Sequence, residues 1–297
     1  MSKKNVIMVV NPVSGGVNKA SLIDQVSHYA KYLNLNLYCF ETTGTDDLQK
    51  LRTYYQEFLP ERVIIAGGDG TIKLVTEALE QYDVVFGILA VGSANGLATD
   101  LGLTKSQEEN IAIAFDENVV EVDYITINGK MCIHLSDLGL NADLIKNYEK
   151  SAVRGKLGYA LQIFKTLLHA GKSFQVSITN NEQLIETKAQ MIVIANSQKY
   201  GTGVVINPIG IMSDGKFELI VLRSINFSVF LKIIMGKIPI SSGHVTVIST
   251  DKATIAINKP TSFQIDGEYC GKETQLNIAI STKKLKIAVL KTQTPVT

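Results

Sequence analysis

The sequence lacks the features that mark several common classes of protein. Its 297 residues include no tryptophan and only three cysteines, Cys39, Cys132 and Cys270. The cysteines are odd in number and far apart, so they do not suit a disulfide-rich secreted domain, and they lack the spacing of a zinc site. This pattern predicts reduced thiols and a cytoplasmic protein.

Charge is also low and balanced. Lysine and arginine total 29, aspartate and glutamate total 28, and the formal net charge is +1. Non-specific binding to nucleic acid depends on an excess of positive charge, so we expect no nucleic-acid partner. The four histidines, His28, His134, His169 and His244, are isolated and carry no catalytic signature, so we interpret them as structural.

Long apolar runs and targeting signals are missing as well. A membrane-spanning helix needs about 20 apolar residues, and the best candidate, Phe227 to Met235, is short and contains Lys232. Ser2-Lys3-Lys4 leads straight into the strand-like run Val6 to Val10, which does not fit a signal peptide. Hydrophobic residues make up 45% of the chain and charged residues 19%, enough for a substantial folded core.

The first 120 residues show a regular alternation of strand-like and helix-like segments. Short apolar runs predict strands at Val6–Val10, Leu37–Phe40, Val63–Ala66 and Val84–Leu89. Apolar residues at helical spacing predict helices around Leu22–Leu33, Leu48–Phe58, Ile72–Leu79 and Leu97–Leu101. Ser21 and Asp24 form a possible capping pair for the first helix, and Thr71 fits the N-cap of the third. This alternation predicts a doubly wound, mostly parallel α/β domain.

The pattern changes near residue 120. Val120–Ile127 alternates polar and apolar residues, and Asn128-Gly129 then marks a tight hairpin. Strand-like runs separated by glycine and asparagine turns dominate the rest, with convincing helical stretches only at Gly155–Ala170 and Phe227–Met235. The second half therefore predicts an antiparallel β-sandwich or irregular barrel.

These two patterns define the predicted domains. Residues 1–125 are predicted to form an α/β domain suited to nucleotide binding. Residues 126–297 are predicted to form a β domain that binds a second substrate. For the last strand of the chain we keep an alternative prediction, in which it packs back onto the first domain.

Three glycine loops follow three strands of the first half: Asn11 to Gly16, Gly67 to Gly70 and Gly92 to Gly96. Ligands of open α/β sheets bind beyond the carboxyl ends of the strands, so these loops are expected to share one rim. Backbone N–H groups and a helix N-terminus converging there suit a phosphate, and Asp69 could face a metal ion that the phosphate carries. Neither a P-loop nor a G-x-G-x-x-G motif is present, and a single such loop would be an ordinary turn.

Carboxylates near the C-terminus are the second candidate feature. Asp214-Gly215 and Asp266-Gly267 both read as hairpin turns, but Glu268 follows Asp266 at the second position. If Thr261 to Cys270 were one continuous strand, Asp266 and Glu268 would lie on the same face. One could then accept a proton from an attacking hydroxyl while the other binds a metal or orients it. Asp123 is a further candidate, with the alternative that it faces solvent from a strand.

The motifs together carry a family resemblance over essentially the whole chain. They are Asn11-Pro-x-Ser-Gly-Gly16, Gly67-Gly-Asp-Gly-Thr71, Gly92-Ser-Ala-Asn95 and Asp266-Gly-Glu268. In this order and at this spacing they resemble the diacylglycerol kinase catalytic family of lipid kinases. The Gly67–Thr71 pentapeptide is shared with NAD kinases and phosphofructokinases. The Asp266-Gly-Glu268 element and the pattern Ala195-Asn196, Tyr200-Gly-x-Gly203 and Asp214-Gly215 favour the lipid kinases.

The resemblance implies an ATP- and Mg²⁺-dependent kinase acting on a lipid hydroxyl. It implies that Glu268, with Asp266 beside it, is the base, and that Asp69 acts with the magnesium and phosphates. Asp123 would lie near the catalytic metal and Asp214 would belong to a second, structural metal site. The residues that match the ATP site are Asn11, Pro12, Ser14, Gly15, Gly16, Thr42, Gly67, Gly68, Asp69, Gly70, Thr71, Lys73, Gly92, Ser93 and Asn95.

The sequence also departs from the family pattern. Gly96 stands where bacterial diacylglycerol kinases usually carry aspartate, and Lys73-Leu74 stands where many members have Asn-Glu. These changes remove one metal carboxylate and place a cation near the phosphates. Two alternatives stay open: an NAD kinase with a soluble acceptor, and a nucleotide- or lipid-binding regulator without activity.

The expected partner is a lipid at the inner face of the membrane, which the protein meets peripherally. The predicted helix Arg154–Ala170 has an apolar side that either packs on the core or contacts the bilayer, and the Phe227–Met235 stretch has the same two interpretations. The sequence leaves the oligomeric state open, a homodimer included.

Overall fold

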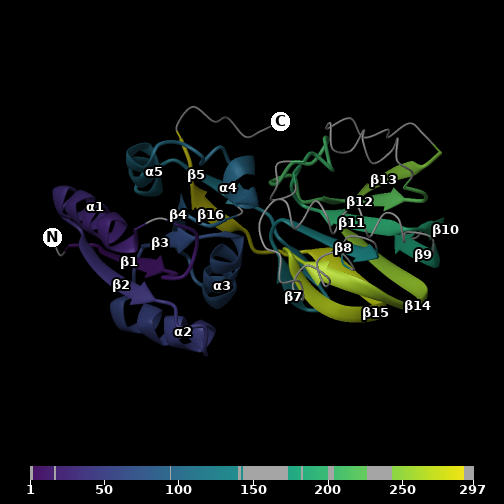
Figure 1. Cartoon of the computed structure of the whole chain (residues 1–297), viewed down its shortest axis with the longest axis horizontal. Helices are drawn as coiled ribbons and strands as arrows, with labels where there is room; N and C mark the ends of the chain where they lie inside the picture. The colour runs from purple at the N-terminus through teal and green to yellow at the C-terminus, as the bar shows by residue number, and fades with distance from the viewer. Residues whose placement is uncertain are drawn as a thin grey trace. The chain divides into compact units, whose positions relative to one another are not determined.

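A computed structural model describes residues 3–16, 18–93, 95–139, 142, 173–181, 183–199, 204–225 and 243–290. The chain forms two compact units, each with its own sheet (Figure 1). The first unit runs to Asp123 and includes the segment that begins at Thr282, and the second is Tyr124–Ser281. The predicted helices at 155–170 and 227–235 and the Tyr200–Gly203 motif lie outside the described residues.

The described part of the first unit contains a six-stranded sheet with the strand order β2-β1-β3-β4-β16-β5. All neighbouring pairs are parallel except β16 and β5, which are antiparallel. The strands are β1 (Asn5–Val10), β2 (Asn36–Glu41), β3 (Arg62–Gly67), β4 (Val85–Ala90), β5 (Val119–Val122) and β16 (Leu285–Ala288). The helices are α1 (Lys19–Tyr32), α2 (Asp47–Phe58), α3 (Asp69–Leu79), α4 (Gly96–Asp100) and α5 (Gln107–Ala114).

Helices cover both faces of this sheet (Figure 1). On one face, Val6 and Met8 of β1 pack against Leu22 and Val26 of α1 and Ile111 of α5. On the other, α2 packs against α3. Both faces of β1 and β3 are buried, and burying one Val or Ile side chain contributes about 1.5–3 kcal/mol. The predicted doubly wound, mostly parallel domain is confirmed.

The starts of two helices differ from the sequence prediction. α1 begins three residues earlier than the proposed capping pair, because the Asn18 side chain accepts a hydrogen bond from the Ser21 N–H. α3 begins at Asp69 with Gly68 as the N-cap, so Thr71 lies inside the first turn and is not the cap. The N-cap of this helix therefore lies three residues earlier than predicted, which brings Asp69 into the helix.

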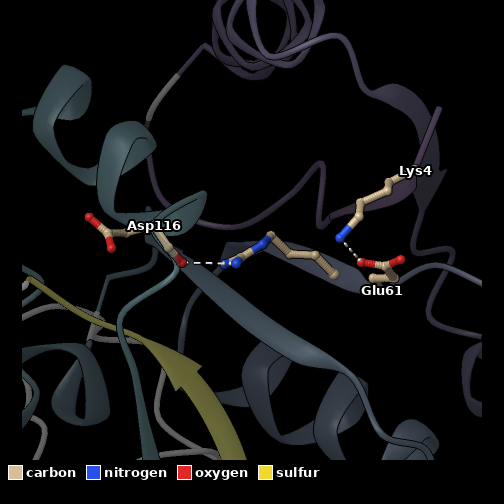
Figure 2. Close-up of polar contacts among 4 residues, drawn as sticks. Lys4, Glu61 and Asp116 are labelled. Atoms are coloured by element: carbon tan, nitrogen blue, oxygen red, sulfur yellow. Dashed lines mark hydrogen bonds and ion pairs between the residues drawn. The ribbon is translucent and has the colours of Figure 1, made fainter. Parts of the chain in front are cut away.

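Helix α5 was missed by the sequence analysis. Ser106 and Glu109 form a capping box at its start, a signal that is readable in the sequence. At its other end, the buried Arg62 guanidinium donates to the carbonyl oxygens of Ala114 at 2.9 Å and Asp116 at 2.8 Å. Figure 2 shows the contact at Asp116, and beside it the exposed ion pair of Lys4 and Glu61. Arg62 thus joins the end of α5 to the first residue of β3.

The run Val120–Ile127 is two strands and not one. β5 ends at Val122 in the first unit, and β6 (Ile125–Ile127) pairs in the other sheet. The solvent-facing interpretation of Asp123 is wrong: its side chain is fully buried and forms an ion pair with Lys284 at 3.0 Å. The alternation of polar and apolar residues was misleading here because the chain changes sheet within the run.

The second unit contains a ten-stranded antiparallel sheet among its described residues. Eight strands follow the order β13-β12-β11-β8-β14-β15-β6-β7, and β9 joins β10 to β14. The further strands are β7 (Lys130–Cys132), β8 (Leu135–Gly139), β9 (Phe174–Asn180), β10 (Gln183–Ala189), β11 (Met191–Ala195), β12 (Phe217–Leu222), β13 (Val245–Thr250), β14 (Lys252–Ile265) and β15 (Glu268–Ile280).

The long strand β14 folds this sheet around its core. Residues 254–257 of β14 pair with β9, and its last three residues pair with β8. Its pairing with β15 shifts register between Ala256 and Thr261 and again between Phe263 and Gln264. Leu138, Phe217, Ile255 and Phe263 are among the buried side chains that fill the main core. The predicted antiparallel β domain is confirmed, and so is the hairpin at Asn128-Gly129, where both residues have positive φ.

Candidate active site

The three glycine loops meet at the carboxyl end of the parallel sheet. They follow β1, β3 and β4, which are neighbours in the sheet. Asn11 N–H donates to the carbonyl of Ala66 at 3.1 Å, and Val91 N–H donates to the carbonyl of Gly67 at 3.0 Å. These bonds continue the strand pairing into the loops, so the loops begin side by side.

Asn11 links the first loop to helix α3. Its side-chain amide donates to the Thr71 hydroxyl at 3.1 Å, and its side-chain oxygen accepts from the Val13 N–H at 3.1 Å. The Ser14 hydroxyl donates to the Asn11 carbonyl at 3.0 Å. One asparagine therefore fixes its own loop and the first turn of α3 together.

Glycine is required where the loops touch. A Cβ on Gly15 would lie 2.0 Å from the Val91 carbonyl oxygen, and Gly15 also has a φ of +55°. A Cβ on Gly92 would lie 2.4 Å from the Cα of Gly68. The first and third loops, and the third and second, are thus in backbone contact. At Gly15 and Gly92 the loops therefore meet through backbone atoms.

Asp69 connects the second loop to the third. Its carboxylate accepts hydrogen bonds from the N–H groups of Gly96 at 2.8 Å and Leu97 at 3.2 Å, at the start of α4. Asn95 closes the third loop on itself, because its side chain bonds both the N–H and the carbonyl of Gly92 at 3.0 Å. The carboxylate of Asp69 is therefore held at the rim by backbone donors.

A fourth segment, beginning at Thr42, lies next to the first loop. The Thr42 N–H donates to the Val10 carbonyl at 2.9 Å, where β2 runs beside β1. The buried Asp47 accepts from the N–H groups of Thr43 at 2.9 Å and Gly44 at 2.7 Å. Burial works to raise the pKa of Asp47, but these hydrogen bonds outweigh it and hold the pKa below its usual value. Asp47 thereby stabilises the turn that follows Thr42.

Lys19 is a cation at the rim that the sequence analysis missed. Its ammonium group donates to the Ser14 carbonyl at 2.6 Å, and partial burial lowers its pKa. The available signal was a lysine a few residues after the first loop, at the start of the next helix. Lys73, the predicted phosphate-site cation, is half-buried in α3.

The Asp266-Gly267 element is a two-residue turn and not part of one strand. β14 ends at Ile265, β15 begins at Glu268, and these two residues pair. The turn residues have φ values of 50° and 86°, as favoured for Asp-Gly hairpins. Asp266 and Glu268 are therefore not two carboxylates on one face of a continuous strand. The Glu268 side chain is exposed, and that of Asp266 turns back onto the residues before β8.

The predicted metal-binding aspartates have different surroundings. No group of three or more His, Cys, Asp and Glu side chains that could hold a metal ion occurs among the described residues. The Asp123 carboxylate is buried against Lys284, and that of Asp214 is exposed and accepts from the Lys216 N–H at 3.0 Å. Each of these two carboxylates is thus held by a residue of its own unit.

The cysteines, the apolar helices and the other loop residues were also subjects of sequence predictions. Cys39, Cys132 and Cys270 are free thiols. No helix in the described part of the chain is both long and apolar enough to cross a membrane. Pro12, Gly16, Gly70 and Ser93 lie in or next to the glycine loops, and no Cβ contact within 4 Å restricts Gly16 or Gly70.

Two family models match the chain. Residues 5–127 match the diacylglycerol kinase catalytic domain. Residues 137–289, more than half of the chain, match the YegS C-terminal NAD kinase beta sandwich-like domain. The first match covers most of the first unit, and the second runs through the second unit and on into β16 of the first.

Individual relatives have low sequence identity to this chain, but the matches cover most of each protein. The chain is 23% identical to the diacylglycerol kinase of Bacillus subtilis (strain 168), over 70% of this chain and 71% of that protein. It is 26% identical to the probable lipid kinase YegS of Salmonella heidelberg (strain SL476), over 73% and 75%.

Solved structures share the fold. A protein from Bacillus anthracis str. Sterne superposes with a TM-score of 0.82 at 21% identity, covering 98% of this chain and 99% of that one. An NAD kinase from Archaeoglobus fulgidus, solved in complex with ATP, gives a TM-score of 0.58 at 13% identity, covering 96% and 94%.

Proposed function

The chain belongs to the family of the diacylglycerol kinase catalytic domain and the YegS-type C-terminal domain, and we propose that it is an ATP- and magnesium-dependent lipid kinase. It transfers the γ-phosphoryl group of ATP to a hydroxyl of a diacylglycerol-like or sphingoid-like lipid. The acceptor is reached at a membrane surface, with which the protein makes peripheral contact from the cytoplasm.

The convergence of the three glycine loops is the observation that carries this proposal. Asn11 ties the first loop to α3, Gly15 packs on Val91, and Gly92 packs on Gly68. Backbone N–H groups and the N-terminus of α3 then face one rim, an arrangement that suits the phosphates of a nucleotide. Phosphoryl transfer depends mainly on such positioning and on charge stabilisation.

The donor set at the rim fits magnesium that arrives with the nucleotide. Magnesium usually keeps waters and binds one or two carboxylates together with substrate phosphates. Asp69, oriented by the N–H groups of Gly96 and Leu97, would supply the protein carboxylate. When bound, the cation would neutralise charge that develops on the transferred phosphoryl group. Lys19 donates to the first loop, and Lys73 lies in the helix that follows the second loop, so both would add positive charge.

Glu268 is the proposed proton acceptor for the lipid hydroxyl. Its carboxylate is exposed at the start of β15, directly after a turn with fixed geometry. A general base must reach the attacking hydroxyl, so an exposed carboxylate on a rigid turn suits the role. Asp123 and Asp214 are kept as proposed metal ligands.

One specific observation favours a second candidate. The fold also matches that of an NAD kinase, and the Gly67–Thr71 turn alone does not decide between acceptors. An NAD kinase would act in the absence of lipid and detergent. The third candidate, a nucleotide-binding regulator, would bind ATP without transferring phosphate to any acceptor.

The test is to incubate the protein with labelled ATP, Mg²⁺ and separate pools of diacylglycerol, sphingoid base or NAD, and to follow the label by mass spectrometry. We expect label in a lipid pool, loss of transfer when EDTA removes the metal, and no transfer by Asp69→Ala or Glu268→Ala. Label in NAD alone would establish the second candidate. ATP binding by calorimetry without any labelled product would establish the third.

A further inference from the structure

The turn at Asp266-Gly267 is held more firmly than an ordinary hairpin turn. Three consecutive backbone N–H groups donate to the Asp266 carboxylate: those of Ile133 at 3.1 Å, His134 at 2.9 Å and Leu135 at 3.2 Å. The Cys132 thiol makes a longer contact at 3.5 Å. In return, the Asp266 N–H donates to the Leu135 carbonyl at 2.8 Å. The segment that links β7 to β8 thus forms a clamp around one carboxylate.

These bonds occupy the Asp266 carboxylate. A carboxylate offers about four lone-pair sites, and four donors from residues 132–135 point at this one. To accept a hydrogen bond from a substrate hydroxyl, Asp266 would have to give up one of its hydrogen bonds to a backbone N–H. A backbone donor left unpaired in a buried setting is costly. Its carboxylate is therefore suited to holding the turn and not to catalysis.

The second residue of the turn, Gly267, is linked to β8 through the side chain of Gln264. The Gly267 N–H donates to the side-chain oxygen of Gln264 at 2.7 Å. The Gln264 side-chain nitrogen donates to the Asp137 carboxylate on β8 at 2.6 Å, which fixes the direction of the amide. Both Gln264 and Asp137 are buried, at 1% and 0% exposure. Asp137 thus sets the position of Gly267 through Gln264.

The clamp is anchored in turn to the next strand. Asn196, at the end of β11, donates from its side chain to the Ile133 carbonyl at 2.9 Å and from its N–H to the His134 carbonyl at 3.1 Å. The donors that hold Asp266 therefore cannot shift without breaking bonds to β11. Buried networks in which the members satisfy one another are rigid.

From these contacts we propose that Asp266 is a positioning residue that fixes the Glu268 carboxylate, with Gln264 and Asp137 as its supports. The proposal rests on the proposed role of Glu268 as proton acceptor. It assigns the two carboxylates different tasks: one is immobilised by backbone donors, and the other, two residues later, is left exposed to meet the acceptor. A base displaced by about 1 Å loses on the order of 100-fold in rate, so positioning of this kind has a measurable effect.

The kinetic test compares Asp266→Asn, Glu268→Gln and the double variant. Removing the base is expected to lower kcat by about 10²–10⁴-fold. Asp266→Asn keeps the shape but turns an NH₂ group toward N–H donors, so kcat should fall by about 10- to 100-fold while KM for ATP stays within about twofold. In the double variant the second change should add no further loss, because Asp266 acts only through Glu268.

A matched control comes from the Asn128-Gly129 turn of the same unit. Asn128 also has positive φ, and its side chain bonds the Asn277 N–H and the Gln275 carbonyl on β15. Asn128→Ala should lower thermal stability without changing kcat. If it lowers kcat as much as Asp266→Asn does, the kinetic effect is one of general stability and the proposal fails.

Amide hydrogen exchange tests the clamp without any activity. In the wild type the amides of Ile133, His134 and Leu135 should be protected, and Asp266→Asn should speed their exchange at least about tenfold while Glu268→Gln leaves it unchanged. Gln264→Met serves if Asp266→Asn does not fold, and it should lower kcat and leave KM for ATP unchanged. Unchanged exchange in Asp266→Asn, or a loss of kcat equal to that of Glu268→Gln, would overturn the positioning role. A wild type without kinase activity would instead overturn the proposed function, and the exchange result would still decide whether the clamp exists.

Discussion

The side-chain amide of Asn11 donates to the hydroxyl of Thr71 across 3.1 Å, although the two residues lie 60 positions apart in the chain. Asn11 follows β1, and Thr71 lies in the first turn of α3, where its side chain is 5% exposed. Asp69 joins the second and third loops through backbone N–H donors, and the bond between Asn11 and Thr71 joins the first and second loops through two side chains. It is therefore the place where the geometry of the rim can be altered with the smallest chemical change.

Thr71→Val should weaken nucleotide binding more than it weakens the fold. The substitution keeps the shape and removes the acceptor, at a cost of about 1 kcal/mol in the free energy of unfolding. KM for ATP should rise several-fold as the first loop loses its link to α3. Thr53→Val, at an exposed position of α2, is the control and should leave KM unchanged. In a double-mutant cycle with Asn11→Ala the two losses should not add, and simple additivity would contradict a direct coupling.

Gly15→Ala should damage the fold, and Gly16→Ala should not. A Cβ at Gly15 would lie 2.0 Å from a backbone carbonyl oxygen and would be strained by the positive φ, whereas nothing lies within 4 Å of a Cβ at Gly16. The first change forces the first and third loops apart, at a cost of about 1–3 kcal/mol for the strained backbone alone. Thermal denaturation of both variants measures the difference. Equal melting temperatures would show that the two loops do not pack as described.

The glycine loops show how far the sequence can predict the site. Buried strands followed by glycine define three βα turns, and the rule that such turns share one edge of a parallel sheet is purely topological, so the rim was predictable. The partners of the side chains were not. Asp69 bonds the N–H groups of Gly96 and Leu97 because of how the second and third loops approach in three dimensions. Lys19 bonds the Ser14 carbonyl of its own loop, and the spacing alone does not show that the side chain folds back onto it.

The sequence predictions that were wrong also have causes in the three-dimensional arrangement of the chain. Val120–Ile127 reads as one strand because its alternation continues through the place where the chain leaves one sheet for the other, and this hid the burial of Asp123. Asp266 and Glu268 read as one face of a strand only if Asp266-Gly267 does not turn. Helix α5 was missed although Ser106 and Glu109 form a capping box, because its apolar residues follow no single face.

Asp47 should make the first unit sensitive to acid. Hydrogen bonds from Thr43 and Gly44 favour the charged carboxylate and hold its folded-state pKa below the unfolded value of about 3.9. A depressed pKa contributes stability that is fully present above the unfolded pKa and is lost as the pH falls through the folded pKa. The wild type should therefore lose stability below about pH 4 more steeply than Asp47→Asn does. Urea denaturation at a series of pH values measures how the free energy of unfolding changes with pH in both proteins. Parallel curves would show that Asp47 does not cause the loss of stability in acid.

Arg62 should be the most sensitive cation of the first unit among the residues described here. Its guanidinium is buried and donates to the carbonyls of Ala114 and Asp116. Burial works to lower its pKa, and nearby Glu117 and Asp116 oppose this change. Arg62→Met removes both bonds and leaves the carbonyls after α5 unpaired, which should cost about 2–4 kcal/mol. Arg62→Lys cannot reproduce the planar fork and should recover only part of this loss.

The neighbouring ion pair in Figure 2 supplies the control for Arg62. Lys4 and Glu61 lie 2.7 Å apart, but their side chains are 64% and 61% exposed. Exposed pairs of this kind contribute little, because water and salt screen them and two long side chains must be ordered. Lys4→Met should leave the melting temperature almost unchanged at physiological salt, while Arg62→Met lowers it by several degrees. If the two substitutions lower the melting temperature equally, the loss of a positive charge near β3 is enough to explain both effects. The anchoring of α5 by Arg62 would then not be what stabilises this unit.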